Sequence, residues 1–351
     1  MPPTTTTTLP PLRILHCACF HHRKYAGWYE SIDNKLTRGL TLNGHYVYDF
    51  SYRDVAKNEA LLPIKKLGWR KVNERLIDCA QQMEPDVLLL GHSELITNKT
   101  VQTIRQQFPR MKVAVWYCDP LWVPEKHALL QSKRAIADVI FTTTGGPILQ
   151  DFASTTCRAA HFPNPLDPAI ESYRSFERKK WTYDLCFAGT EKGEPQRTEL
   201  LRKILQSGDS NLRLSIHKAF EEPPIQGHRY LKNISESMVG LNLSRRWNVP
   251  WYTSDRLAHI VGNGCVALSP KTEGLPELLG EDGAVWFESA EDALKQLNKL
   301  KAQPDLARTI GKAGWARLHQ QASSQLVTGW MLEFLFETKE RSVCWSEQRS
   351  I

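Results

Sequence analysis

The sequence has no apolar stretch near the roughly 18 to 20 residues that a helix needs to cross a lipid bilayer. Its opening segment, MPPTTTTTLPP, lacks the charged and apolar regions of a signal peptide. None of the eight cysteines forms a C-x-x-C pair, and most stand inside apolar runs. We therefore expect buried free thiols rather than disulfides or zinc, and a disordered lead-in at residues 1–11. We expect the protein in the cytoplasm, either free or in peripheral contact with the inner face of the membrane.

A recognisable nucleic-acid-binding motif is also missing. The densest basic clusters are RSFERKKW (174–181) and LSRRW (243–247), and neither belongs to such a motif. The net charge of +7 indicates an anionic partner without naming it, because nucleic acid, phospholipid and nucleotide phosphate all attract cations. The charge is not concentrated enough to favour DNA, and we expect no nucleic-acid partner. Apolar residues make up 41% and charged residues 24%, as in ordinary soluble globular proteins. At 351 residues the chain exceeds the usual size of one hydrophobic core, which favours two domains.

Short apolar runs alternate with amphipathic stretches through the first half. Continuously apolar runs are typical of strands buried on both faces, and their alternation with helices predicts a doubly wound parallel α/β sheet. The predicted strands are 13–20, 46–50, 86–92, 112–117 and 138–144, and the predicted helices are 28–40, 69–83, 98–108 and 125–135.

Three prolines in HFPNPLDP (161–168) interrupt this pattern, since proline continues neither a helix nor a central strand. A second series follows, with strands predicted at 183–190, 212–217, 238–244, 265–268 and 284–287 and helices at 195–206, 228–236 and 289–302. We expect domains at 12–165 and 166–322. A C-terminal helix and tail at 323–351 would follow, with LVTGWMLEFLFETKE packing across the domain interface.

The segment WYTSDRLAHIVGNGCVALSP (251–270) predicts a tight helix-to-strand unit. Ser254 or Asp255 caps the helix, and free amides at a helix start form a site for phosphate. The guanidinium group of Arg256 adds a positive charge and paired N–H donors suited to phosphate oxygens. Asn263 and Gly264 are expected to end the helix as left-handed residues, before a buried strand.

The next strand end predicts a second polar loop at the same edge of the sheet. Lys271, Thr272, Glu273 and Gly274 follow the strand, and a short helix is expected to begin at Pro276. Two neighbouring loops with hydroxyls, a lysine and helix starts predict a pocket for a nucleotide sugar.

These residues carry a resemblance to a known family. Arg256, Gly264, EGLPELL (273–279), ESAEDALKQL and RTIGKAGWARL resemble the C-terminal half of GT-B glycosyltransferases, in particular CgeB-like proteins near the GT4 group (glycosyl transferases group 1). The resemblance covers about residues 162–320. It is looser in the N-terminal half, where it rests on WYCDP (116–120) and FPNPLDP.

The resemblance implies two Rossmann-like domains facing a cleft, with the nucleotide-sugar donor on the C-terminal side and the acceptor on the N-terminal side. It implies no metal and no cofactor, and the sequence offers no D-x-D cluster. Positive groups and helix amides would stabilise the departing phosphate. The candidate donor-binding residues are Gly189, Thr190, Ser244, Thr253, Ser254, Asp255, Arg256, His259, Lys271, Thr272, Glu273, Gly274 and Glu277.

One departure from the family concerns the ribose. Many GT4 members carry two glutamates eight positions apart, and here Trp251 and His259 stand at the corresponding places. Ribose recognition by that route, and UDP as the nucleotide, are therefore left open, with Glu273 or Glu277 as the alternative carboxylate.

The acceptor hydroxyl of an inverting transferase needs a base, for which histidine or a carboxylate serves at neutral pH. The candidates are His21, His22, His92 and Asp119, and each lies at or just after the end of a predicted strand. A zinc site at HCACFHH is not expected, because alternate residues of a strand point to opposite faces.

We therefore expect a glycosyltransferase that moves a sugar from a nucleotide-sugar donor to a glycan, a lipid-linked saccharide or a protein without a metal. Two alternatives stay open: a sugar-nucleotide epimerase of the same fold, and a non-catalytic binding or assembly protein. The missing glutamate pair is the best support for the second alternative.

Overall fold

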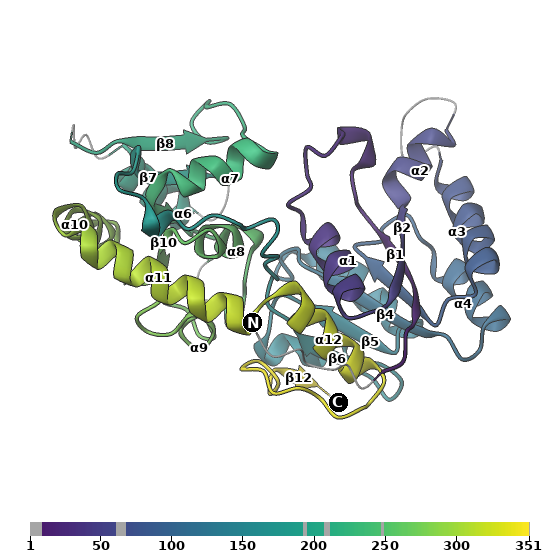
Figure 1. The fold of residues 1–351 in the computed structure, drawn as a ribbon. Coiled ribbons are helices and arrows are strands. Elements are labelled where there is room, and N and C mark those ends of the chain that lie inside the picture. Colours follow the sequence, from purple (N-terminus) through teal and green to yellow (C-terminus); the bar gives the residue numbers. More distant parts are fainter. Residues whose placement is uncertain (1–8, 61–67, 192–194, 207–210, 247–248, 351) are drawn as a thin grey trace. The chain divides into compact units, whose positions relative to one another are not determined.

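The computed structural model describes residues 9–60, 68–191, 195–206, 211–246 and 249–350 (Figure 1). The chain divides into two compact units. The first consists of Met1–Pro163 together with Ser324–Ile351, and the second of Asn164–Ser323. Each has its own sheet with helices around it, which confirms the predicted α/β class with two Rossmann-like domains.

The first unit is built on one largely parallel sheet, which has seven strands among the described residues, in the order β12-β6-β5-β4-β3-β1-β2. Only β12 runs antiparallel, against β6. The side chains of β3, VLLLG, and β5, VIFT, are all buried, which is why these runs are apolar without alternation. The strands are β1 Arg13–Ala18, β2 Tyr46–Ser51, β3 Val87–Gly91, β4 Lys112–Tyr117, β5 Val139–Thr142, β6 Arg158–His161 and β12 Arg349–Ser350.

The last long helix, α12 (Ser324–Leu335), belongs to the first unit and packs against α1 (Ile32–Leu42) (Figure 1). A Cβ at Gly39 of α1 would lie 2.2 Å from the carbonyl oxygen of Ser324, so glycine lets the two helices approach closely. Trp330 of α12 packs edge-on against Phe141 of β5, with ring centroids 6.0 Å apart. The C-terminal segment, expected as a separate piece, therefore completes the first core.

The other helices of the first unit follow the strands in turn. They are η1 His22–Lys24, α2 Tyr52–Asn58, α3 Trp69–Met83, α4 Asn98–Gln107, α5 Pro124–Ser132, η2 Lys133–Ala135 and η3 Gly146–Phe152. The expected helix at 28–40 begins later, at Ile32, because the chain first makes the short turn η1.

The second unit contains a parallel sheet of five strands among the described residues, in the order β11-β10-β9-β7-β8. The strands are β7 Tyr183–Ala188, β8 Leu214–His217, β9 Ser237–Leu241, β10 Val266–Pro270 and β11 Val285–Phe287. The helices are η4 Ser175–Glu177, α6 Pro195–Leu205, α7 Gly227–Ser235, α8 Asp255–Gly262, α9 Leu275–Leu279, α10 Ala290–Ala302 and α11 Pro304–Gln321.

All eight cysteines are free thiols, as expected, and most are buried. Within the described part of the chain, no helix combines the length and the apolar character that crossing a membrane requires.

Candidate functional site

The order of the strands marks one ligand-binding edge in each unit. In the first sheet the chain goes from β1 to β2 on one side and then to β3 on the other side of β1. In the second sheet it goes from β7 to β8 and then to β9 on the opposite side of β7. Open α/β sheets bind ligands at the carboxyl ends of the strands where the order reverses. The candidate edges are therefore the ends of β1 and β3, and the ends of β7 and β9.

Arg256 lies at this reversal point in the second unit. Its Nε donates to the carbonyl oxygen of Ala188 at the end of β7 (3.2 Å), and its Nη1 donates to that of Leu243 after β9 (3.0 Å). The guanidinium also lies over the ring of Phe187, 5.2 Å from its centre. Among the described residues it has no carboxylate partner, so two of its five N–H donors hold it in place and the positive charge is uncompensated.

Gly189 keeps the space beside this guanidinium open. A Cβ at Gly189 would stand 2.6 Å from Nη2 of Arg256, closer than any side chain allows. The neighbouring Thr190 is half-buried. Glycine at the end of β7 thus lets the arginine lie across the strand ends with Nη2 beside the glycine Cα.

Arg197 on α6 brings a second guanidinium to the same strand ends. The side chain is buried, and its Nε donates to the carbonyl oxygen of Ser244 (3.0 Å). Burial, with Arg256 and Arg245 nearby, lowers the pKa of Arg197 to about 10. Burial also lowers the pKa of Arg256, and Arg245 adds to this. Crowded cations of this kind are stabilised when an anion binds between them.

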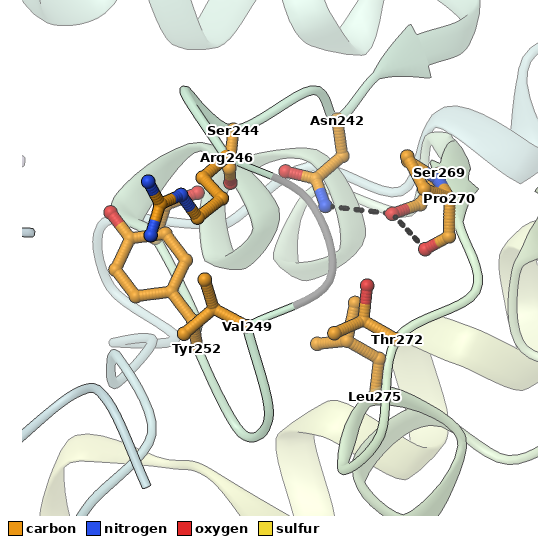
Figure 2. A pocket seen from close by; sticks show the side chains of 10 residues that line it. Asn242, Ser244, Arg246, Val249, Tyr252, Ser269, Pro270, Thr272 and Leu275 are labelled. Carbon is orange, nitrogen blue, oxygen red and sulfur yellow. Dashed lines mark hydrogen bonds between the residues drawn. The ribbon is translucent and has the colours of Figure 1, made fainter. Parts of the chain in front are cut away.

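A small cavity opens beside these arginines, between the ends of β9 and β10; we call it the α8 pocket (Figure 2). Ser254 is the N-cap residue of α8, as expected, but its hydroxyl makes no capping hydrogen bond, and Oγ is buried with no partner among the residues that the structure describes. The pocket is lined by Asn242, Ser244, Arg246, Val249, Tyr252, Ser254, Ser269, Pro270, Thr272 and Leu275.

Thr253 and Asp255 hold the chain segment that enters the second unit. The hydroxyl of Thr253 accepts a hydrogen bond from the backbone N–H of Asn164 (2.9 Å), and the carboxylate of Asp255 accepts one from the side-chain amide of Asn164 (3.1 Å). Both side chains are thus occupied in fixing the start of α8, and the pocket lining does not include them.

His259 lies on the buried side of α8. Its Nδ1 is 2.7 Å from the Glu171 carboxylate, and both side chains are almost wholly buried. The ring of Tyr230 packs edge-on against it at 5.3 Å. His259 therefore clamps α8 to the segment after the domain boundary and does not line the α8 pocket.

The loop after β10 distributes the other predicted residues differently. Thr272 lines the pocket, whereas Lys271 forms an exposed ion pair with Glu281, 3.0 Å long. Glu277 accepts a hydrogen bond from the backbone N–H of Gly274 (2.9 Å) and so caps its own helix. Glu273 has an exposed side chain, and its carbonyl oxygen accepts a bond from the Trp251 N–H (2.8 Å). Gly274 has a φ of 90°, and a Cβ at this position would collide with the Trp251 ring.

The end of α8 and the start of α9 differ from the expectation. Of the pair after α8, only Gly264 is left-handed, with a φ of 71°, whereas Asn263 has a φ of −92°. Asn263 instead ends the helix through its side chain, which donates to the carbonyl oxygen of His259 (2.8 Å). Helix α9 begins at Leu275, one residue before the expected Pro276.

In the first unit, His92 and Asp119 come together at the ends of β3 and β4. Their Nδ1 and Oδ2 atoms are 3.8 Å apart, and Lys126 binds the same Oδ2 at 2.5 Å. The Nε2 of His92 is 3.4 Å from the Cys118 sulfur. Burial lowers the pKa of His92 from its usual 6.5, with Asp119 opposing the shift, so the imidazole is neutral at neutral pH. Its φ of 55° shows local backbone strain.

His21 and His22 follow β1 but face different surroundings. The imidazole of His21 stacks on Trp28 with Nε2 3.4 Å from the Cys19 sulfur, and burial lowers its pKa. His22 is exposed and lines a hollow of about 660 Å³ with Asp49. The four candidate bases are therefore spread over several places along this edge, and only His92 and Asp119 form a pair.

The described residues contain no group of three or more histidine, cysteine, aspartate or glutamate side chains that could hold a metal ion. Sequence reasoning missed Arg197 and Asn242 at the second edge. Asn242 directly follows the buried strand β9, which is a usable signal, whereas Arg197 lies in a helix with ordinary surface charges and gives none.

Comparison with known families finds a match that lies mostly in the second unit. Residues 197–328 match the family model described as glycosyl transferase-like. This region is therefore similar to glycosyl transferase-like proteins, and the chain as a whole has the GT-B fold. The matched region begins at Arg197 and includes the α8 pocket, so the family match and the polar strand ends coincide. The CgeB-like subgroup is not distinguished by this match.

Solved structures share the fold over nearly the whole chain. An alpha-glucosyltransferase in complex with UDP-glucose and DNA containing an abasic site is 13% identical, with a TM-score of 0.62 over 93% of this chain and 100% of its own. Sucrose-phosphate synthase from Thermosynechococcus elongatus is 14% identical, with a TM-score of 0.57 over 93% and 98%. A putative UDP-N-acetylglucosamine 2-epimerase from Listeria monocytogenes is 11% identical, with a TM-score of 0.51 over 95% and 99%. No sequence among the curated proteins matches the chain.

Proposed function

We propose that the chain is a glycosyltransferase that takes a sugar from a nucleotide-sugar donor to a glycan, lipid-linked or protein acceptor. The observation that carries this proposal is Arg256, held on the carbonyl oxygens of two strand ends with no carboxylate partner among the described residues. A guanidinium fixed in this way adds a permanent positive charge where an anion enters.

The chemistry of glycosyl transfer explains why this arrangement is useful. When the bond between the sugar and the nucleotide breaks, negative charge develops on the departing diphosphate. Arg256, Arg197 and the amides at the start of α8 lie near one another and are fixed before the reaction, so they stabilise this charge without reorganising. No step of this account requires a metal ion.

The donor class has further support from the comparisons. The alpha-glucosyltransferase of the same fold is in complex with UDP-glucose. The DNA in that complex belongs to that protein, and we propose a saccharide, lipid-linked or protein acceptor for this chain. A diphosphate carries more charge than a monophosphate, so two arginines favour UDP-, GDP-, dTDP- and ADP-sugars over CMP-sugars.

For the acceptor side we propose His92 as the base. Burial keeps its imidazole neutral, as proton abstraction requires. Lys126 lies 2.5 Å from the Asp119 carboxylate and forms an ion pair with it, which holds Asp119 in place to orient His92.

The experiment is a turnover screen of the full chain with UDP-, GDP-, dTDP-, ADP- and CMP-sugars, with release of free nucleotide as the readout. We expect one nucleoside diphosphate sugar to be consumed, by transfer when a saccharide acceptor is present or by slow hydrolysis without one. Interconversion of the sugar nucleotide without nucleotide release would instead identify an epimerase, a reaction that the likeness to the 2-epimerase structure keeps in the test. Binding without any turnover would identify an assembly role.

A further inference from the structure

One hydrogen-bond acceptor in the wall of the α8 pocket is oriented by its neighbours. The side-chain amide nitrogen of Asn242 donates to the hydroxyl oxygen of Ser269 (2.9 Å), and that hydroxyl is 3.2 Å from the carbonyl oxygen of Pro270 (Figure 2). A serine hydroxyl has a single hydrogen, which it gives to the Pro270 oxygen. Asn242 must therefore present its NH₂ group to Ser269, which leaves its oxygen, Oδ1, directed away from Ser269.

This oxygen is buried, since only 5% of Asn242 is exposed, and it has no hydrogen-bond partner among the described residues. The hydroxyl of Ser254 at the start of α8 is a second pocket atom without a partner in the described part of the chain. Buried polar atoms without hydrogen bonds are costly and rare, so two of them in the wall of one cavity point to a ligand that satisfies both.

The size of the cavity restricts the group that can enter. Its volume is about 20 Å³, and a single water needs about 10–15 Å³ of such space. A hydroxyl group fits, whereas a base or a sugar ring does not. The described lining residues include no carboxylate. The nearby carboxylates are occupied elsewhere, because Glu171 is paired with His259 and Glu277 caps its own helix. Arg246 also lines the pocket, so its wall combines neutral polar atoms with one guanidinium group.

We propose that the α8 pocket recognises one hydroxyl group of the donor, which donates to Asn242 Oδ1 and accepts from the Ser254 hydroxyl. This inference rests on the proposed function, since Arg256 and Arg197 would hold the neighbouring phosphates. The hydroxyl comes either from the ribose or from the transferred sugar. The neutral amide of Asn242 can accept its hydrogen bond without the repulsion that a carboxylate would exert on the neighbouring phosphates.

The test measures binding of UDP, 2′-deoxy-UDP, 3′-deoxy-UDP and UDP-glucose by calorimetry to the full chain and to Asn242→Ala and Ser254→Ala. The same series on GDP, its deoxy forms and GDP-mannose covers a guanine donor. If the ribose supplies the hydroxyl, the wild type binds one deoxy form about 10-fold more weakly than the parent nucleotide, and Asn242→Ala removes this difference. If the sugar supplies it, Asn242→Ala weakens the sugar nucleotide about 10-fold and leaves the nucleoside diphosphate unchanged.

Two controls protect this test. Ser254→Ala removes a hydroxyl that makes no hydrogen bond to any described residue, so the variant should unfold at the wild-type temperature. It should nevertheless lose the preference for the ligand hydroxyl that the wild type shows. Asn233→Ala is the matched control, because Asn233 also donates to a buried serine hydroxyl, that of Ser215 (2.6 Å), without lining the α8 pocket. Equal affinities of all ligands for the wild type and both pocket variants would overturn the inference while leaving the proposed function intact. Failure of UDP-, GDP-, dTDP- and ADP-sugars alike to bind the wild type would instead overturn the proposed function.

Discussion

The two sheets present chemically different edges at their reversal points. At the edge of the first unit the charges are paired, as in Lys126 with Asp119 and Arg53 with Glu94 (2.9 Å), and aromatic rings surround the histidines. At the edge of the second unit, Arg256 makes its hydrogen bonds to backbone carbonyls and has no described carboxylate partner. We therefore propose that the same topology provides a proton-accepting edge in one unit and an anion-binding edge in the other.

This difference teaches that the strand order gives the place of a site but not its chemistry. In both units the reversal point follows from the chain crossing from one side of the first strand to the other. The side chains that follow each strand decide what binds there. A glycine and arginines suit phosphate, whereas a buried neutral histidine suits a hydroxyl group that must lose its proton.

The largest effect that distinguishes the two edges is expected from replacing the proposed base, His92. We expect His92→Gln to lower kcat by about 10²–10⁴-fold, because glutamine cannot take up the proton. Affinity for the sugar nucleotide should not change. The matched control is His45→Gln, since His45 is also buried with a lowered pKa but lies at the start of β2, on the opposite edge. Equal losses of kcat in both variants would point to a structural role for His92.

The next largest effect concerns the space beside Arg256. Gly189→Ala places a Cβ 2.6 Å from Nη2 and forces the guanidinium to move. We expect the affinity for the sugar nucleotide to fall about 10-fold, through loss of part of one charged hydrogen bond. The thermal unfolding temperature, measured in parallel, should change little, because the clash falls on the far end of a flexible side chain, which can shift without moving the backbone. Unchanged affinity would show that the phosphates do not lie near Gly189.

The pH dependence separates the two edges without a mutation. Burial lowers the pKa of His92 below its usual 6.5, so the neutral, active form persists at pH 6.5 and is lost only at lower pH. We therefore expect kcat to stay constant from pH 8 down to about 6.5 and to fall below it. Donor affinity should be flat over this range, because the arginines stay charged. A kcat that already falls between pH 8 and 7 would contradict His92 as a buried neutral base.

The smallest effect is expected at Lys271, which the sequence placed among the donor-binding residues. Its ammonium group forms an exposed ion pair with Glu281, and such pairs contribute little. Lys271→Ala should change sugar-nucleotide affinity by no more than about 2-fold. A loss of 10-fold or more in the same titration would show that Lys271 leaves Glu281 and reaches the donor.

Much of the fold could be predicted from the sequence, because most elements are long or strongly patterned. The strand KVAVWY (112–117) and the helix 69–83 appear with the predicted bounds. Helix α2 was missed because it has only seven residues, and β6 because RAAH lacks the β-branched residues that mark a strand. The packing of α12 on α1 was not predictable from the pattern, because an apolar helix does not reveal its partner.

The site was less predictable than the fold, for a physical reason. Helix capping and turn rules locate Ser254 and Arg256 because local sequence determines them. Long-range partners decide the rest: Thr253 and Asp255 bond to Asn164, and His259 bonds to a glutamate 88 residues away. A local pattern identifies the start of the helix but cannot tell which of its side chains are already occupied.

The central claim is that the strand ends of the second unit bind the donor phosphates through Arg256. Calorimetric titration of the preferred sugar nucleotide into Arg256→Ala and Arg308→Ala tests it most directly. Arg308 is a matched arginine, which lies over the Trp181 ring at 4.7 Å and donates to the carbonyls of Arg178 and Lys179 before β7, at the opposite edge of the sheet. We predict a loss of affinity of about 10–100-fold for Arg256→Ala and none for Arg308→Ala. Equal affinities of the two variants, with both folded as the wild type, would contradict the account.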